Sequence, residues 1–272
     1  MKRICLTALP FLFLFYLSGC IEIFTTIRVK PDGSGTIEKN LMMSKEAIMM
    51  ISNFFPKRDS SGDKGFDIFD EAKFRNDASE MGDGVSYLSG KKLTTEDKEG
   101  YDIIYSFNDI SRLKIGENPR EIVASPSTIQ FDSASRDDYI SFDLKKNDPS
   151  VLTITLPSEE FQEKKKEQLE SAVDTFQIDP ETEKKIKQMM RGMKMSFVVD
   201  MLAGIEETNA AYREGSRIVL AEINFGKLVE DPNNYKRFLS MKDKPFIEAK
   251  EFLRTLPGIK IELNHKVEVT FK

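Results

Sequence analysis

Few residues of this sequence belong to the types on which catalysis and metal binding usually depend. His265 is the single histidine, and Cys5 and Cys20 are the two cysteines. A Ser-His-Asp triad would therefore have to use His265, and a metal site built from several histidines is excluded. His265 lies in an alternating apolar segment, where we expect a satisfied core or edge residue. A general base would need a partner that orients it.

Acidic residues form the next group that could do chemistry. They gather in one hairpin-like region and as one adjacent pair: Asp132, Asp137, Asp138, Asp143, Glu206 and Glu207. Paired carboxylates can serve a hydrolase or bind calcium, whose ligands are oxygen atoms. However, no Asp-x-Asp-x-Asp-Gly loop is present, and a chain with 45 acidic residues contains such pairs by chance. We therefore predict no calcium site.

Methionines form the sharpest local cluster in the sequence. Its members are Met189, Met190, Met193 and Met195. Thioethers can bind copper, but no histidine or cysteine lies nearby to complete a site, and methionine readily fills irregular gaps in a core. We expect these residues to be core. Because phosphate loops, nucleophile elbows and His-Glu-x-x-His motifs are also absent, we predict a protein that is not an enzyme and has no cofactor.

The N-terminus carries the clearest pattern. Lys2 and Arg3 precede an apolar run from Ile4 to Leu17. This run of about 14 residues is shorter than the roughly 20 that a helix needs to cross a bilayer core. The pattern predicts a cleaved secretion signal at residues 1–19.

The next residues, Leu17-Ser18-Gly19-Cys20, resemble the lipobox of bacterial lipoproteins. The resemblance implies that a diacylglyceryl group alkylates the Cys20 thiol and that a type II signal peptidase cuts between Gly19 and Cys20. It also implies two or three acyl chains on Cys20, which anchor the protein in a membrane. Ile21 stands where an aspartate directs enterobacterial lipoproteins to the inner membrane. The resemblance therefore favours the periplasmic side of the outer membrane if the organism is Gram-negative.

Composition narrows the partners of the mature chain. The precursor has a net charge of −5, and removal of Lys2 and Arg3 makes it more negative, so we expect no nucleic-acid partner. The basic run 164–166 lies among glutamates and predicts a solvated helix face. With Cys5 removed and Cys20 lipidated, no thiol is left for a disulfide or a nucleophile. Stability must therefore come from the core.

Alternating β-branched residues directly after Cys20 predict a strand at 21–30, with no flexible tether before it. The turn residues of 31–35 and a second alternating run at 36–43 predict a hairpin. Ser44 is expected to cap an amphipathic helix that ends before Pro56.

The rest of the chain predicts short strands and helices with an irregular connection at 108–126. Strands are expected at 85–93, 101–107, 127–131, 138–144, 151–156, 193–202, 218–225 and 259–271, and helices at 70–81, from 158, at 179–191 and at 245–256. Residues 20–272 are therefore expected to form a single exported α+β domain. Its sheet is expected to be curved and mainly antiparallel, with packed helices and a helical excursion near 158–192.

Two segments resemble LppM-type lipoprotein domains. Residues 26–37, TIRVKPDGSGTI, are similar to the opening of such domains, and 204–210, GIEETNA, before Gly215 and the strand 218–225, is similar to their closing hairpin. The resemblance implies an exported α+β domain with a lipid-handling surface or cavity and no catalytic residues. The Met-rich and Lys/Glu-rich helical region departs from that family.

Three functions are open at this point. The first is a membrane-tethered, non-enzymatic binding or accessory domain of the cell envelope, with a lipid or another apolar ligand as one version. The second is a structural or assembly partner that engages another envelope protein through strand edges or the 158–192 helices. The third is a carboxylate-based hydrolase, which would need a cleft where two acidic groups approach one substrate.

Overall fold

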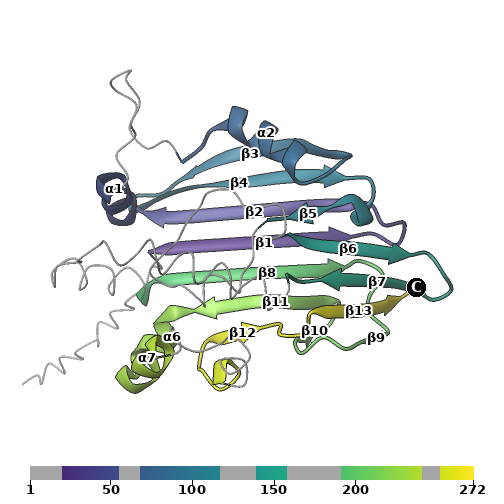
Figure 1. Ribbon diagram of the computed structural model, residues 1–272. Coiled ribbons are helices and arrows are strands. Elements are labelled where there is room, and N and C mark those ends of the chain that lie inside the picture. The colour runs from purple at the N-terminus through teal and green to yellow at the C-terminus, as the bar shows by residue number, and fades with distance from the viewer. Residues whose placement is uncertain (1–19, 55–67, 117–138, 158–190, 241–251) are drawn as a thin grey trace, which may run out of the picture.

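Strands are the commonest elements in the computed structural model, which describes residues 20–54, 68–116, 139–157, 191–240 and 252–272 (Figure 1). Several predictions fall outside these ranges. They are the signal at 1–19, the strand at 127–131, the helices from 158 and at 179–191, and most of the helix at 245–256.

The described residues form one larger sheet, which we call the large sheet. Its strands are β1 Ile21–Val29, β2 Gly35–Ser44, β3 Val85–Thr94, β4 Lys98–Phe107, β8 Met193–Met201, β10 Arg213–Glu214, β11 Arg217–Asn224 and β12 Ile259–Ile261. They follow the order β10-β11-β8-β1-β2-β4-β3, and β12 pairs with β11. Neighbouring strands are antiparallel except for β1 and β8, which are parallel.

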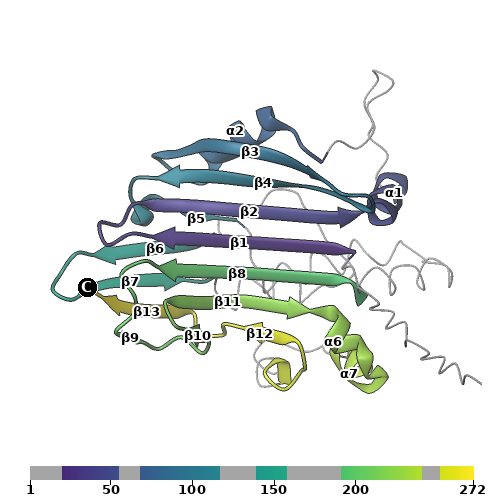
Figure 2. The ribbon, with the colours of Figure 1, turned by 180° about the vertical axis from the view of Figure 1, so that it is seen from behind.

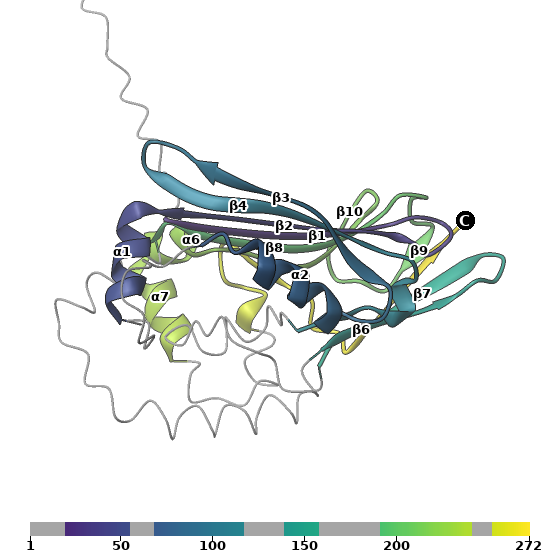
Figure 3. The same ribbon diagram turned by 90° about the horizontal axis from the view of Figure 1, so that it is seen from above.

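A second sheet, which we call the small sheet, is antiparallel throughout its described strands. These are β5 Lys114–Ile115, β6 Ile140–Lys145, β7 Ser150–Thr155, β9 Glu207–Thr208 and β13 Lys266–Phe271. Their order is β5-β6-β7-β13-β9. Strands β6 and β7 lie against one face of the large sheet, towards the end of the sheet that is far from α1 (Figure 3).

The core lies where these two layers face each other. Ile27 and Val29 of β1 and Val267 and Val269 of β13 are fully buried. In β1, the buried residues Ile27 and Val29 alternate with half-buried polar residues, as expected of a strand with one face on the core. Burial of one such side chain stabilises the fold by about 1.5–3 kcal/mol. The apolar residues whose alternation predicts the strands are therefore also the residues whose burial holds the two sheets together.

The described helices are short, and each begins at a polar capping residue. They are α1 Lys45–Phe54, α2 Glu71–Glu80, α6 Phe225–Glu230 and α7 Pro232–Leu239, with a 3-10 turn, η1 Ile110–Arg112. Asp70 accepts from the Lys73 N–H at 3.0 Å, and Ser44 accepts from the Ala47 N–H at 3.1 Å. Helices α1, α2 and α7 lie on the same side of the large sheet as β6 and β7 (Figure 3).

The predicted fold class is confirmed only in its coarser part. The sheets are mainly antiparallel, and the large one curves (Figure 3), but the described residues are rich in strand and poor in helix. Helix α2 buries Phe74 and Ala78 and contacts β3 at the edge of the large sheet, and the six-residue helix α6 buries Phe225 and Leu228. The described part of the chain is sheet-rich rather than a clear α+β fold with packed helices. The predicted excursion at 158–192 lies almost wholly outside the described residues.

The predicted strand at 259–271 is wrong as a single element. It divides into β12 in the large sheet and β13 in the small sheet. The side chain of Glu262 is completely buried at the division, and its Oε1 accepts from the N–H groups of Leu263 at 2.9 Å and Asn264 at 2.8 Å. These bonds turn the chain while apolar residues continue at every second position, so the sequence pattern hides the bend.

The irregular connection predicted at 108–126 is also corrected in its described part. Residues 110–115 form η1 and β5, with Ile110, Leu113 and Ile115 buried. Elements of two or three residues are too short to show a period, which is why the sequence did not predict them.

Candidate functional site

Cys20 stands directly before β1, at the end of the large sheet where α1 begins (Figures 1 and 2). Its side chain is partly buried and packs against the core. The carbonyl oxygen of Cys20 accepts a hydrogen bond from the Ser44 N–H at 2.7 Å. Ile21, the next residue, is fully buried. Cys20 is therefore already packed and hydrogen-bonded into the described domain, and the predicted lack of a tether after it is consistent with this geometry.

Burial of Ile21 bears on the sorting argument from the sequence. A side chain that is 0% exposed in the first position of a central strand must be apolar for packing reasons alone. The absence of an aspartate at this position therefore follows from the fold, and it supports an outer-membrane location less than the resemblance to lipoproteins implies.

Ser44 joins Cys20 to helix α1. Its N–H bonds to Cys20, and its Oγ accepts from the Ala47 N–H in the first turn of the helix. The next residue, Lys45, bonds to the turn between β3 and β4: its N–H donates to the Asp97 carbonyl at 2.9 Å and its Nζ to the Glu96 carbonyl at 2.7 Å. Three segments that are distant in sequence thus meet around Cys20.

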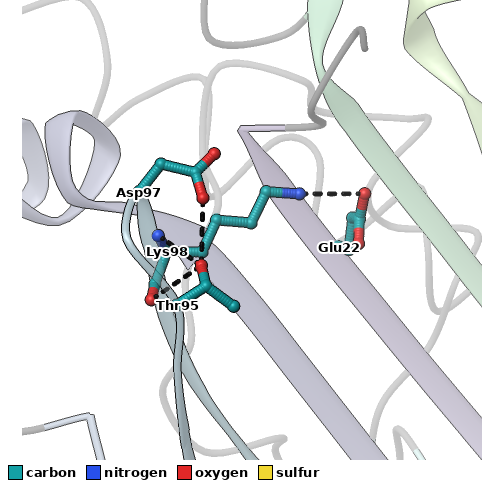
Figure 4. Close-up of polar contacts among 4 residues, drawn as sticks. All are labelled: Glu22, Thr95, Asp97 and Lys98. Carbon is teal, nitrogen blue, oxygen red and sulfur yellow. Dashed lines mark hydrogen bonds and ion pairs between the residues drawn. The ribbon is translucent and has the colours of Figure 1, made fainter.

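The β3–β4 turn is itself held by a small network (Figure 4). Thr95 Oγ1 donates to Asp97 Oδ1 at 3.0 Å and accepts from the Lys98 N–H at 3.0 Å. Lys98 Nζ then reaches Glu22 Oε1 on β1 at 3.3 Å, with side-chain exposures of only 13% and 22%. Since β2 lies between β1 and β4, this ion pair spans three strands.

We call this group the anchor end: Cys20, Glu22, Ser44, the first turn of α1 and the turn 95–98. Its hydrogen bonds and ion pair fix the position of Cys20 relative to α1 and β4. Chemically, the arrangement offers one partly exposed thiol on a rigid platform. The sequence motif identifies Cys20, but the contacts with Ser44, Asp97 and Lys98 come from strand register and could not be predicted from spacing.

A second polar cluster lies on the face of the large sheet opposite the core, which we call the open face. By register, it carries Glu22, Phe24, Arg28, Glu38, Asn40, Lys91 and Asp102. Arg28 Nη1 forms an ion pair with Glu38 Oε2. Neighbouring Asp102 has one oxygen, Oδ1, with no hydrogen-bond partner among the described residues. Sequence reasoning did not single out this cluster, although alternation in β2 and β4 places its members on one face.

Asp102 has a pKa above the ordinary value of 3.8. Burial is the largest cause, and the negative charge of Glu38 adds to it. Lys91 and Arg28 act in the opposite direction. A raised carboxyl pKa can mark a general acid, but it also follows from crowding on a sheet face. Crowding on the sheet face is the explanation that fits, because the Arg28–Glu38 ion pair lies beside Asp102.

The residues with predicted chemistry do not converge in the described structure. His265 is exposed in the bend between β12 and β13, which corrects its expected place on an apolar strand face. Asp143 is exposed on β6, and Glu206 pairs with Lys272 at 2.9 Å. Asp132, Asp137 and Asp138 lie outside the described ranges. In the described part of the chain, no group of three or more His, Cys, Asp or Glu residues could hold a metal ion.

The methionine cluster is core where it can be seen. Met193 is 2% exposed in β8, and Met195 packs against the core from a partly buried position. Met189 and Met190 lie outside the described residues. For the two described members, the prediction of core packing is confirmed.

Glu262 is a buried charge that the sequence did not reveal. Besides turning its own segment, its Oε2 accepts from the Ala211 N–H at 2.7 Å. Nearby, Asn209 donates to the Lys266 carbonyl at 3.1 Å and accepts from the Glu268 N–H at 2.8 Å. The segment before the β10–β11 hairpin is thus bonded to the C-terminal strand. Its role is structural.

Comparisons with known proteins add little to this geometry. No family model matches the sequence, and a search of curated proteins finds no significant match. Among solved structures, the folded domain of LppM from Mycobacterium tuberculosis is similar, with a TM-score of 0.33, 8% sequence identity and coverage of 96% of this chain and 95% of that chain. Similarity at this level supports no inference about fold or function. Among the described residues, no helix is long and apolar enough to cross a membrane.

Proposed function

We propose that this chain is a lipoprotein of the cell envelope in which Cys20 carries the acyl chains and the folded residues form a non-enzymatic binding or accessory domain. The observation that carries the proposal is the position of Cys20. The residue that the lipobox-like motif marks for lipidation is also the residue immediately before the first core strand. A signal ending at Gly19 would remove the precursor segment without cutting into the fold.

Anchoring through Cys20 requires no further membrane-binding element. Each buried methylene contributes about 0.8 kcal/mol, so two or three acyl chains hold a protein on a bilayer persistently. We propose a location on the exported side of the envelope, with the periplasmic side of the outer membrane as the expectation for a Gram-negative host.

Cell fractionation tests the anchor. We expect the wild-type protein in the membrane fraction and a Cys20→Ser variant, exported behind a signal that a type I peptidase removes, in the soluble exported fraction, because serine cannot form the thioether. Phe24→Ser is a matched control: it changes a partly exposed residue four positions along and leaves the motif intact. A Cys20→Ser protein that stays membrane-bound in the same amount would refute the anchor.

We propose a binding role rather than catalysis because several charged side chains in the described part of the chain form ion pairs with one another. Glu22 pairs with Lys98, Arg28 with Glu38, and Lys260 with both Glu214 and Glu222. A hydrolase would instead need carboxylates aimed at a shared substrate position. If Asp102→Asn abolished a hydrolytic activity found in the purified protein, the non-enzymatic proposal would fail.

A lipid or another apolar molecule is our proposal for a bound ligand. Native mass spectrometry of the Cys20→Ser protein, purified without detergent, tests it directly. Co-purified lipid at a fixed ratio would support the proposal. Ligand-free protein that also fails to take up added phospholipid would contradict it.

A second candidate, assembly with another envelope protein, is favoured by one specific observation. Strand β3 lies at the edge of the large sheet, and Leu88, beside a bulge in this strand, is 57% exposed. Sheet edges can accept a strand from another chain. A photo-crosslinking residue at Leu88 should then give one dominant adduct in cells, whereas the same residue at exposed Leu202 should not. Equal labelling at both positions would argue against this edge.

A further inference from the structure

The two ends of the large sheet differ in their relation to Cys20. Strand β1 starts at the anchor end and runs without interruption to Val29, where the turn 30–34 leads back into β2. A nine-residue strand at about 3.3 Å per residue spans about 30 Å. The C-terminus lies at this second end, away from α1 (Figures 1 and 2). We call it the far end.

Cys20 cannot move independently of the domain. Its carbonyl is bonded to Ser44, whose neighbour Lys45 is bonded to Asp97 in the β3–β4 turn. The Lys98–Glu22 pair ties the same turn back to β1. A flexible linker would let a domain tumble above the bilayer. Here the number of residues between the modified cysteine and the first strand is zero, so the acyl chains leave from a fixed point on a rigid surface.

We propose that the anchored domain docks on the phospholipid bilayer by its anchor end and stands upright, with the strands of the large sheet rising from the membrane. The inference rests on the lipid anchor proposed above and adds its geometry. The occupant of this surface is the headgroup layer of the bilayer in which the acyl chains are embedded. The far end is then about 30 Å from the headgroups, as the length of β1 requires.

The chemistry of the anchor end suits a headgroup layer that carries both charges. Lys45 is exposed beside Glu46, Glu96 and Asp97, so the surface has both signs and no basic excess. Met49, on the next turn of α1, is 59% exposed and can enter the interface between headgroups and acyl chains. We therefore expect docking that does not depend on anionic lipid.

The alternative orientation places the open face flat on the bilayer. That face carries Glu38, Arg28 and Asp102, and the pKa of Asp102 is already raised by burial. Covering it with lipid would remove water from three ionisable side chains, which is unfavourable. Burial of Phe24, whose side chain is 36% exposed, would offset only a small part of that desolvation cost. The upright arrangement leaves this face in water.

Spin labels at single introduced cysteines can distinguish these arrangements. The processed protein has no other thiol, because Cys5 leaves with the signal and Cys20 is lipidated. Met49→Cys tests the anchor end and Leu202→Cys, similarly exposed at 53%, is its matched control at the far end. Lys91→Cys tests the open face. All three side chains are exposed, so the variants should fold.

The lipidated proteins are placed in phosphatidylcholine vesicles containing a nickel-chelating lipid, and the relaxation of each nitroxide is measured. We expect strong enhancement at position 49, weak enhancement at 91 and almost none at 202, unchanged when phosphatidylglycerol is added. Equal enhancement at 49 and 202, or the strongest at 91, would overturn the proposal. Intact mass is measured on each sample first: an unmodified Cys20 refutes the anchor and the docking together, whereas a lipidated protein with the wrong profile refutes the docking alone.

Discussion

At the scale of single residues, polar side chains form hydrogen bonds that fix bends in the chain which the pattern of apolar residues does not predict. Glu262 is the clearest case, because a completely buried carboxylate receives three backbone N–H groups where the chain leaves one sheet for the other. The side chain of Asn209 acts similarly through two hydrogen bonds, and the Ser44 hydroxyl through one. The structural role of such a residue is difficult to recognise from the sequence, since each is a single polar residue among apolar ones.

We expect Glu262→Ala to lower the free energy of unfolding by about 2–4 kcal/mol, because it leaves buried backbone donors without an acceptor. Glu262→Gln should cost less, since its amide retains one acceptor oxygen. Urea unfolding in a Cys20→Ser background measures both effects. Glu207→Ala, at an exposed position, should change stability little. Equal midpoints for Glu262→Ala and the parent protein would show that the buried carboxylate does not hold the bend.

Asp102 makes a pH-dependent prediction. Its folded-state pKa is raised, so the folded protein binds this proton more tightly than the unfolded chain does. The charged form therefore costs stability, and the cost develops as pH rises through the raised folded pKa. It is absent below the ordinary value near 3.8, where both states are protonated.

Asp102→Asn should accordingly be more stable than the parent at neutral pH, with a difference that shrinks on acidification. Thermal unfolding of both proteins across the acidic range measures it. A variant that is less stable at neutral pH would mean that the carboxylate makes a favourable interaction on the open face.

At the scale of elements, the sequence predicted strands well where one face is buried. The hairpin β1–β2 and the strands β4, β7 and β8 were predicted from their residue patterns, and α1 from its cap at Ser44 and the spacing of its apolar residues. The partition into two sheets was not predictable, because pairing between β1 and β8 or between β13 and β9 joins segments far apart in the chain. For the same reason, only Cys20 of the anchor end could be identified from sequence.

Gly100 tests the packing between β2 and β4. A Cβ at this position would overlap the carbonyl of Leu41, which is backbone and cannot rotate away. We expect Gly100→Ala to cost about 2–3 kcal/mol, as overpacking in a strand does. Differential scanning calorimetry provides the measurement.

The control for Gly100→Ala is Gly215→Ala. Gly215 has a φ of +65° but no atom within 4 Å of its Cβ position, so it reports backbone strain alone. We expect its loss of stability to be smaller. A Gly100→Ala protein that melts with the parent would show that β2 and β4 are not as close as described.

At the scale of the whole molecule, the described domain is two sheets that share one core, with Cys20 at one end and the C-terminus at the other. The exposed large apolar side chains are Phe24, Met49, Leu88 and Leu202, which lie on separate elements among the described residues. They do not suggest one continuous membrane-binding surface. Attachment to a membrane therefore depends, in our proposal, on what Cys20 carries.

The central claim is tested most directly by the intact mass of the protein extracted from bacterial membranes. We predict the mass of residues 20–272 plus two or three acyl chains, and loss of that species in the Cys20→Ser variant. A chain that retains residues 1–19, or one that begins at Cys20 with an unmodified thiol, would contradict the lipid anchor.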